Sequence, residues 1–258
     1  MASPDRFYNG VASVSAANPL GALPYLDPTT WAVWMDDFVL IPEVSTYWTN
    51  TNTNGTLGVA STGGCGVATQ TMGGADNDLS QLYHKTATFA LTSGKKAIFE
   101  VKAKVDKGAG GTIGQQELFF GLTSVQTGTN FFAADGLSMT ADNCLGFSSY
   151  DGSTNLNAIA RVSDVESVQT GAAVYADATW MVLSFYFDGT SVYFYKDDVL
   201  VATLTTYPTA ALAVCLYLKA GEGAASVLTT DYVLVAVERY RGGLLWAILL
   251  KLVPTLLQ

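Results

Sequence analysis

The chain has few charged residues, few cysteines and a single histidine, and each shortage excludes a class of function. Charged residues make up 14% of the 258 residues, well below the usual quarter. One histidine, His84, excludes a zinc site built from two or three histidines. The odd number of cysteines, Cys65, Cys144 and Cys215, gives no disulfide framework and no CxxC pair. A reducing place of synthesis, such as a cytoplasm, fits this usage best.

Positive charge is especially scarce. Lysine and arginine total 13 against 22 aspartate and glutamate residues, which gives a net charge of −9. No cluster of basic side chains is present to neutralise phosphates, so we expect no nucleic-acid partner. The lysines between 95 and 107 alternate along a predicted strand, which is typical of a solvated strand face.

Long hydrophobic runs are also lacking. The first residues, MASPDRFYNG, have no basic segment followed by an apolar one, so we expect no secretory signal peptide. The apolar run at 244–253 is about half the length of a membrane span. A membrane is therefore not the expected partner.

Short β-strands dominate what is present. In residues 95–105, Ile98 and Glu100 alternate with Phe99 and Val101, a period of two that marks a half-buried antiparallel strand. Two hairpins are predicted in 179–208, with turns at Asp188-Gly189 and at 196–198. Further strands are expected at 36–41, 46–50, 57–61, 66–71, 87–91, 117–125, 136–141, 144–150, 156–163, 211–221 and 227–241. More than ten strands without a convincing helix between them predict an all-β sandwich or barrel.

The sequence divides into three parts. Residues 1–35 are interrupted by prolines and carry several aromatic residues, so we expect an N-terminal extended arm that packs on a surface. Residues 36–241 form the β-sandwich. Residues 242–258 begin with two glycines and continue as a nearly uncharged hydrophobic tail, LLWAILLKLVPTLLQ.

The strand order resembles the concanavalin A-like lectin/glucanase jelly-roll superfamily. The resemblance covers about 36–241 and rests on the opening DDF, on FEVKAKV, FFGL and DGLSM, on the hairpins WMVLSFYFDGTSVYFYKDDVLVAT, and on the last strand TDYVLVAVERYR. The hairpins and the last strand look like those of structural, decoration-type proteins of tailed phages of marine bacteria. This resemblance implies a jelly-roll β-sandwich and a virion component made in a host cytoplasm.

Catalytic residues are hard to find. Hydrolytic relatives carry two glutamates in an ExDxxE-type motif, because hydrolysis needs a nucleophile and an acid/base about 5 Å apart. No such motif occurs, and no two of the six glutamates lie within five residues of each other. Glu117 is the best lone candidate, and Asp135 could approach it across strands, but a role at a strand edge or turn is favoured. We therefore expect that the chain is not an enzyme.

Metal and carbohydrate sites have only weak candidates. Asp76 and Asp78 could supply oxygen ligands to Ca²⁺, yet their position beside two glycines favours a tight turn, so no cofactor is expected. His84 is expected at the surface, at a strand end. Tyr150 and Trp48 are the candidates for stacking on sugar rings.

The hydrophobic tail suggests assembly. It could form a short helix on neighbouring copies or a partner shell, lie at a membrane interface, or fold back on its own domain. We favour the first reading, in which the major capsid protein or tail of a virion, together with copies of this chain in a homo-oligomer, are the partners. The expected assembly contacts are Leu244, Leu245, Trp246, Ile248, Leu249, Leu252 and Val253. The expected function is a capsid decoration, cement or tail-associated protein, and the alternative is a lectin-like module that adheres to host glycans.

Overall fold

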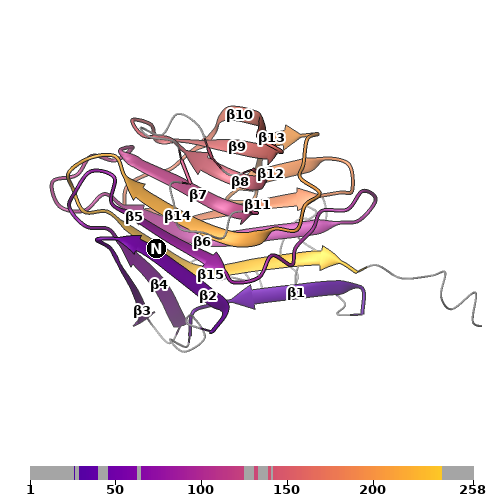
Figure 1. Ribbon diagram of the computed structural model, residues 1–258, viewed down its shortest axis with the longest axis horizontal. Helices are drawn as coiled ribbons and strands as arrows, with labels where there is room; N and C mark the ends of the chain where they lie inside the picture. Colours follow the sequence, from indigo (N-terminus) through magenta and orange to yellow (C-terminus); the bar gives the residue numbers. More distant parts are fainter. Residues whose placement is uncertain are drawn as a thin grey trace, which may run out of the picture.

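The computed structural model describes residues 26, 29–39, 46–62, 65–124, 131–132, 139–140 and 142–239. In this part of the chain the strands form two antiparallel sheets that pack face to face (Figure 1). The all-β sandwich expected from the sequence is confirmed. Among the described residues, no helix has the length and apolar character to cross a membrane.

One sheet has eight strands. Its order is β13-β12-β11-β6-β15-β4-β3, and the eighth strand, β1, pairs with the C-terminal half of β15. Its strands are β1 (Trp31–Asp36), β3 (Thr56–Thr62), β4 (Cys65–Thr71), β6 (Ala97–Asp106), β11 (Met181–Phe187), β12 (Val192–Lys196), β13 (Val199–Leu204) and β15 (Val227–Glu238).

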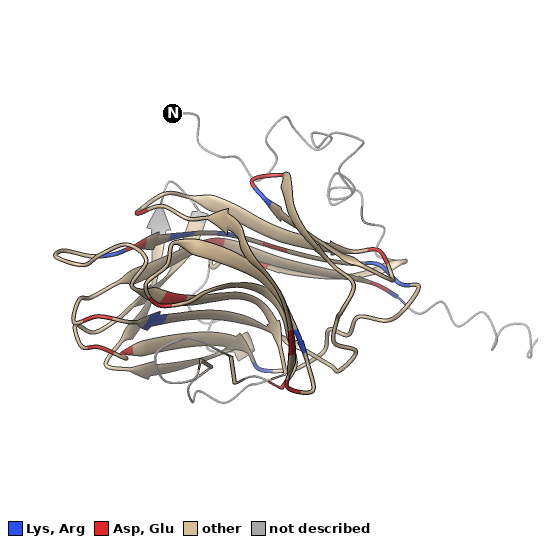
Figure 2. Ribbon diagram, turned by 90° about the horizontal axis from the view of Figure 1, so that it is seen from above, with Lys and Arg blue, Asp and Glu red and all other residues tan. Residues whose placement is uncertain are grey.

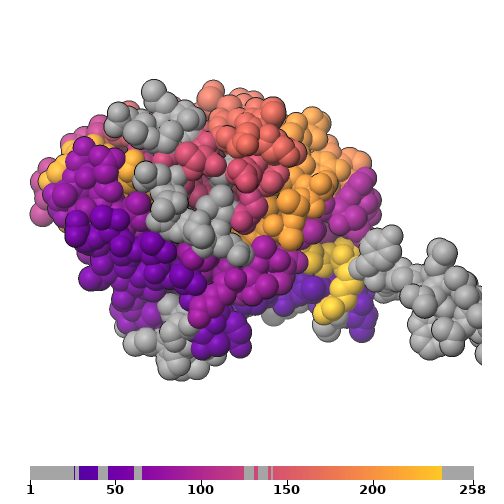
Figure 3. Space-filling view, in the orientation of Figure 1, coloured from indigo at the N-terminus to yellow at the C-terminus, as the bar shows by residue number. Residues whose placement is uncertain are grey.

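The other sheet has seven strands in the order β10-β9-β8-β7-β14-β5-β2. They are β2 (Trp48–Thr53), β5 (Leu79–His84), β7 (Gln116–Thr123), β8 (Cys144–Ser149), β9 (Asn155–Val162), β10 (Val165–Val174) and β14 (Ala213–Ala220). Strand β10 is an edge strand and lies at the top of the molecule in Figures 1 and 3; its Val165 is 70% exposed.

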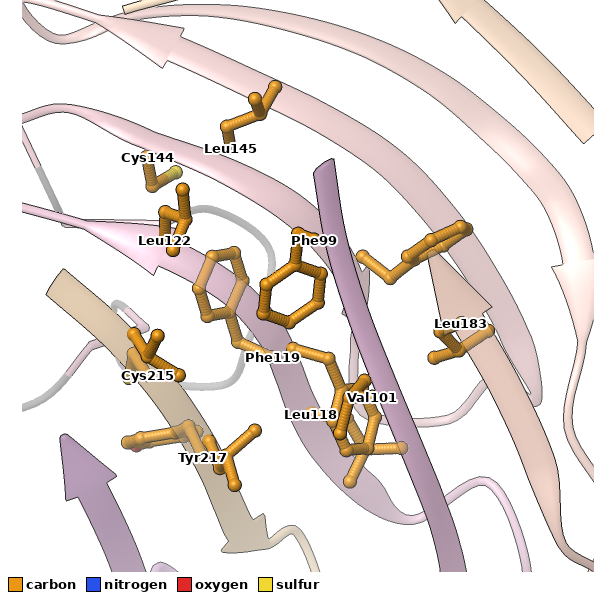
Figure 4. Close-up of a cluster of buried hydrophobic side chains, with 14 of the residues drawn as sticks. Phe99, Val101, Leu118, Phe119, Leu122, Cys144, Leu145, Leu183, Cys215 and Tyr217 are labelled. Atoms are coloured by element: carbon orange, nitrogen blue, oxygen red, sulfur yellow. The ribbon is translucent and has the colours of Figure 1, made fainter. Parts of the chain in front are cut away.

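Aromatic side chains fill the space between the sheets. In the eight-stranded sheet, the rings of Phe99 and Phe185 stack with centroids 5.2 Å apart. Phe194 of the same sheet meets Phe147 of the seven-stranded sheet edge-on, with centroids 5.3 Å apart. Figure 4 shows part of the whole buried hydrophobic cluster, which includes side chains of β6, β7, β8, β11 and β14 on both faces of the seven-stranded sheet. Phe99 and Val101 are fully buried, as the period of two predicts, but the expected solvated face is wrong, since Ile98 is 1% and Lys102 7% exposed on the other side of β6.

Both predicted hairpins are confirmed. Asp188 and Gly189 join β11 to β12, and the Asp188 carboxylate accepts hydrogen bonds from the backbone N–H groups of Thr190 and Ser191, each at 2.8 Å. These bonds hold the pKa of Asp188 down, at about 2. Between β12 and β13, Asp197 and Asp198 take positive φ angles of 49° and 65°, as a tight hairpin turn requires.

Several strand boundaries differ from the expectation. β1 occupies Trp31–Asp36, so it begins inside the segment 1–35 that was expected to be an irregular arm, and residues 37–39 of the expected strand at 36–41 are not in a strand. Residues 87–91 contain one isolated bridge, at Phe89, and no strand. β5 and β10 were not predicted. Every residue of β5 is buried, the polar Ser80 and Gln81 included, so LSQLYH shows no regular alternation of polar and apolar residues. Every residue of β10 is exposed or half-buried at the sheet edge.

Charged side chains lie mainly at strand ends and in turns, as Figure 2 shows. Two buried exceptions stand within strands. Lys102 of β6 pairs with Asp231 of β15, with 2.7 Å between the lysine nitrogen and the carboxylate oxygen. The second exception, in the seven-stranded sheet, belongs to the candidate site.

Candidate functional site

The seven-stranded sheet has one face packed on the other sheet and one face turned away from it. Phe147 points inward, because it contacts Phe194 across the sandwich. Phe120 of β7 lies directly opposite Phe147 and shares that direction. Successive side chains alternate along a strand, so Phe119 and Glu117 point to the opposite side, called here the outer face.

A buried ion pair stands on the outer face. Glu117 of β7 and Lys219 of β14 are direct neighbours in the sheet register. The lysine nitrogen lies 3.2 Å from one carboxylate oxygen and 3.1 Å from the other. The two residues are only 1% and 2% exposed. Each charge therefore depends on the other, because a lone buried charge is strongly destabilising.

Tyr217 lies beside this pair, two residues before Lys219 on the same face of β14. Its hydroxyl is buried and has no hydrogen-bond partner within the described part of the chain. Burial, and then the charge of Glu117, raise the pKa of this hydroxyl far above its usual value. Gln81 of β5 is the register neighbour of Tyr217, and its amide nitrogen lies 3.5 Å from the sulfur of Cys215.

Two phenylalanine rings cover this part of the outer face. The Phe131 ring lies 4.7 Å from Phe119 and 5.4 Å from Tyr217, measured between centroids. Phe132 packs on Tyr217 at 5.3 Å and meets Tyr150 edge-on at 5.8 Å. These contacts explain how the ring of Tyr217 remains buried on a sheet face that no second sheet covers.

Tyr150 and Glu166 form the more accessible end of the same face. Tyr150 follows β8 directly, and its hydroxyl donates a hydrogen bond of 3.3 Å to the Glu166 carboxylate on β10. Both residues are half-buried. Burial, and then the nearby Glu166 charge, raise the pKa of Tyr150 to about 12. An aromatic ring beside a carboxylate can bind a sugar, because the C–H groups of the sugar stack on the ring and its hydroxyls donate hydrogen bonds to the carboxylate.

Trp48, the other expected sugar contact, occupies a different environment. It is 2% exposed and lies on the inner face of β2. Its indole N–H donates to the Asp36 carboxylate at 2.6 Å, and its ring packs on Trp34 and Phe38. A ring covered in this way offers no surface to a sugar, so the expected carbohydrate contact at Trp48 does not fit the structure.

The calcium candidates behave as turn residues. The Asp78 carboxylate is 3% exposed and accepts hydrogen bonds from the Asn54 amide at 3.0 Å and from the Ala75 backbone N–H at 3.1 Å. Asp76 is exposed in the same turn. Among the described residues, no group of three or more histidine, cysteine, aspartate or glutamate side chains is arranged to hold a metal ion.

His84 and Glu117 differ from their expected places. His84 does end a strand, β5, but it is 8% exposed, and its ring lies among aromatic rings that include Trp34 at 4.9 Å. The expected surface position is therefore wrong. Glu117 lies in a central strand and pairs with Lys219, so the favoured role at a strand edge or turn is also wrong. Asp135 lies outside the described residues, as do all seven expected assembly residues of the tail.

Lys219, Tyr217 and Glu166 were missed by the sequence reasoning. A signal existed for the first, since Lys219 is a lone charge at the end of the apolar run ALAVCLYLKAG. A charge in such a run requires a partner when the strand is buried on both faces. The identity of that partner depends on the pairing of β14 with β7, which is about 100 residues away along the chain.

The solved structures that this chain resembles include carbohydrate-active proteins of the concanavalin A-like jelly-roll class and a protein of unknown function from Shewanella oneidensis, which aligns with a TM-score of 0.55 at 13% identity, over 88% of this chain and 96% of that one. An endo-1,3-beta-glucanase from Streptomyces sioyaensis aligns with a TM-score of 0.56 at 13% identity, over 82% of this chain and 98% of that one. An endo-beta-1,4-glucuronan lyase from Trichoderma reesei gives 0.54 at 11%, over 78% and 94%. The carbohydrate recognition domain of Emp47p gives 0.53 at 10%, over 81% and 97%. No protein-family model and no curated protein matches the chain.

These similarities show the fold, and they correct one expectation. The expectation that the chain is not an enzyme is contradicted, because the same fold occurs in a glucanase and in a glucuronan lyase. The absence of an ExDxxE motif argues only against one reaction, hydrolysis by a pair of glutamates. One fold can support several reactions, so this absence was too narrow a basis for that expectation. The concanavalin A-like resemblance itself is confirmed.

Proposed function

We propose that this chain is a glycan-binding protein and that its ligand contacts the outer face of the seven-stranded sheet at Tyr150 and Glu166. The observation that carries this proposal is the hydrogen-bonded pair of a half-buried ring and a carboxylate on a sheet face that no other sheet covers. Support comes from the fold, which is shared with the carbohydrate recognition domain of Emp47p.

The aromatic cover strengthens the choice of this end of the face. Phe132 meets the Tyr150 ring edge-on at 5.8 Å and so fixes its orientation. A ring held in place loses little conformational entropy when a sugar stacks on it. A carboxylate can accept more hydrogen bonds than the one that Glu166 receives from Tyr150, so it can also accept hydrogen bonds from sugar hydroxyls.

A glycan array followed by calorimetry with the best ligand tests this proposal. Tyr150→Ala removes the ring, and we expect affinity to fall about tenfold or more, which is about 1.4 kcal/mol. Tyr150→Phe is the matched control: it keeps the ring and loses only the hydrogen bond to Glu166, so it should retain most of the affinity. Failure of the wild-type chain to bind any glycan, or equal binding by Tyr150→Ala, would refute the proposal.

A second candidate function is glycan cleavage, favoured by the cluster of Glu117, Lys219 and Tyr217. Neighbouring buried titratable groups, one of them with a strongly shifted pKa, are typical of catalytic sites. The partner of Glu117 is a lysine, whereas hydrolysis by the common route uses a second carboxylate. Proton transfer within the cluster is the chemistry that this set of side chains supports best.

Cleavage is tested by incubating the chain with neutral and acidic polysaccharides. New reducing ends report hydrolysis, and the ultraviolet absorbance of an unsaturated product reports elimination. Glu117→Gln and Tyr217→Phe should abolish either signal while Tyr150→Phe leaves it largely intact. Turnover that survives Glu117→Gln and Tyr217→Phe would exclude this cluster as the catalytic site.

A virion structural role, the more specific prediction from the sequence, rests on the arm and tail. The tail residues at 244–253 lie outside the described part of the chain. A role in assembly is compatible with glycan binding, because the tail and the seven-stranded sheet are separate parts of the sequence. We keep it as a proposal that deletion of 242–258 tests.

A further inference from the structure

The eight-stranded sheet carries an aromatic patch on the face that points away from the sandwich. Phe185 and Phe194 point inward, so Tyr186, Tyr193 and Tyr195, their neighbours along β11 and β12, point outward. The patch is defined here by Ile98, Tyr186, Tyr193, Tyr195, Leu234 and Ala236, which form a cluster separate from the main core.

The patch is continuous across four strands. Tyr186 and Tyr193 are direct register neighbours, with ring centroids 6.3 Å apart and planes 28° from parallel. Ile98 of β6 lies between Tyr186 of β11 and Ala236 of β15 in the same row. Ile98 is 1% exposed and Ala236 is completely buried, although no second sheet lies on this side. Apolar side chains on an outer sheet face are buried to this degree only when other atoms cover them, so a further segment lies on this patch.

The chain itself supplies the first part of that cover. Leu26 is partly buried and packs against the cluster, as does Trp31 at the start of β1. The backbone N–H of Arg239 donates to the carbonyl of Thr30 at 2.7 Å, which fixes the chain beside the end of β15. β1 lies next to β15 (Figure 1), and both Trp31, at the start of β1, and Leu26, five residues earlier, contact the patch.

We propose that residues 1–25 continue across this patch, so that the N-terminal segment of the same chain is its occupant. The segment carries Phe7, Tyr8 and Tyr25 and only two charged side chains, Asp5 and Arg6. Its prolines favour an extended backbone. An extended chain advances roughly 3.3 Å per residue and strands lie about 4.8 Å apart, so the segment is long enough to cross from β6 to the sheet edge at β13.

This inference is independent of glycan binding, because the patch and the proposed glycan surface are on different sheets. It also assigns the arm a role that differs from the assembly role expected from the sequence. An N-terminal arm that covers a sheet of its own chain is not available to bind a neighbouring subunit.

Photo-crosslinking in the full-length chain tests the proposal. Benzoylphenylalanine is placed at Phe7 or at Leu20, and the crosslinked peptides are identified by mass spectrometry. We expect crosslinks to peptides within 181–196 in a species that migrates as a monomer. The same probe at Val165, exposed on β10 of the other sheet, is the matched control and should not react with 181–196.

Two outcomes would overturn the proposal. Crosslinks from the arm that map away from β6, β11, β12 and β15 would show that the patch has another cover. Crosslinks to 181–196 found only in a dimer band would show that the cover is the arm of a second copy.

Hydroxyl-radical footprinting gives an independent readout. Removal of residues 1–25 should raise the modification of Tyr186 and Tyr193 several-fold, and a synthetic peptide of residues 1–25 should reverse the change. Tyr47, which is 50% exposed and lies outside the patch, is the internal control and should react equally in both proteins. Unchanged labelling of Tyr193 after truncation, or protection of Tyr193 by an added oligosaccharide in the truncated chain but not by the peptide, would refute the proposal. If the truncated chain does not fold, the crosslinks in the full-length protein still decide the question.

Discussion

The buried pair of Glu117 and Lys219 makes the sharpest prediction about stability. Each residue is at most 2% exposed, so solvent does not screen the charge that remains when its partner is removed. Removing one partner of such a pair typically costs about 3–5 kcal/mol. Glu117→Leu and Lys219→Leu should therefore each lower the free energy of unfolding by about 4 kcal/mol, or the melting temperature by roughly 10 °C.

The double variant, Glu117→Leu with Lys219→Leu, separates this explanation from a simple loss of packing. Replacing both charges with apolar side chains leaves no uncompensated charge, so the double variant should be more stable than either single variant. Urea denaturation followed by tryptophan fluorescence measures all four proteins. Lys102→Met serves as a comparison, because it breaks the pair with Asp231 on the other sheet.

One result would refute the reasoning. If both single variants lose less than about 1 kcal/mol, the pair behaves like an exposed ion pair, and the outer face of the seven-stranded sheet is open to water in solution. In that case the aromatic cover made by Phe131 and Phe132 would not be closed on average, and the cluster would be accessible to a ligand.

Three further predictions concern pH, metal and assembly. Burial raises the pKa of Tyr150, and that of Tyr175, the buried residue that follows β10, to about 12, so both tyrosines stabilise the fold in the neutral form. Their contribution should be complete below about pH 10 and be lost as the pH rises towards 12. Spectrophotometric titration and alkaline unfolding check this, and ionisation of both at the ordinary tyrosine pKa would contradict it. Asp78 acts as a turn residue, so Ca²⁺ or a chelator should leave the melting temperature unchanged, whereas Asp78→Ala should cost about 1–3 kcal/mol for the two donors it leaves unpaired. A clear rise in melting temperature with Ca²⁺ would instead favour a metal site. Deletion of 242–258 should prevent assembly with partners while preserving the circular dichroism of the sandwich, and normal assembly of the truncated chain would exclude the tail as an anchor.

The candidate site was only partly predictable. Tyr150 could be picked out because an aromatic residue in the turn SSYDGST is conspicuous on local grounds. Trp48 gave the same local signal, yet Asp36 and Trp34 cover it from another sheet. Whether a tryptophan is exposed depends on residues outside its own strand, and the sequence next to Trp48 does not indicate which residues will cover it.

Local features of the sequence decided the class of fold. The period of two in 95–105 and the turns at Asp188-Gly189 and 196–198 act over a few residues, so they can be read directly as strands and hairpins. The pairing of β7 with β14, in contrast, cannot be read from neighbouring residues. It joins segments about 100 residues apart, and their register follows from how whole sheets bury their apolar side chains. Only that register places Glu117 beside Lys219 and Tyr217, and for this reason the chemistry of the outer face belongs to the tertiary structure.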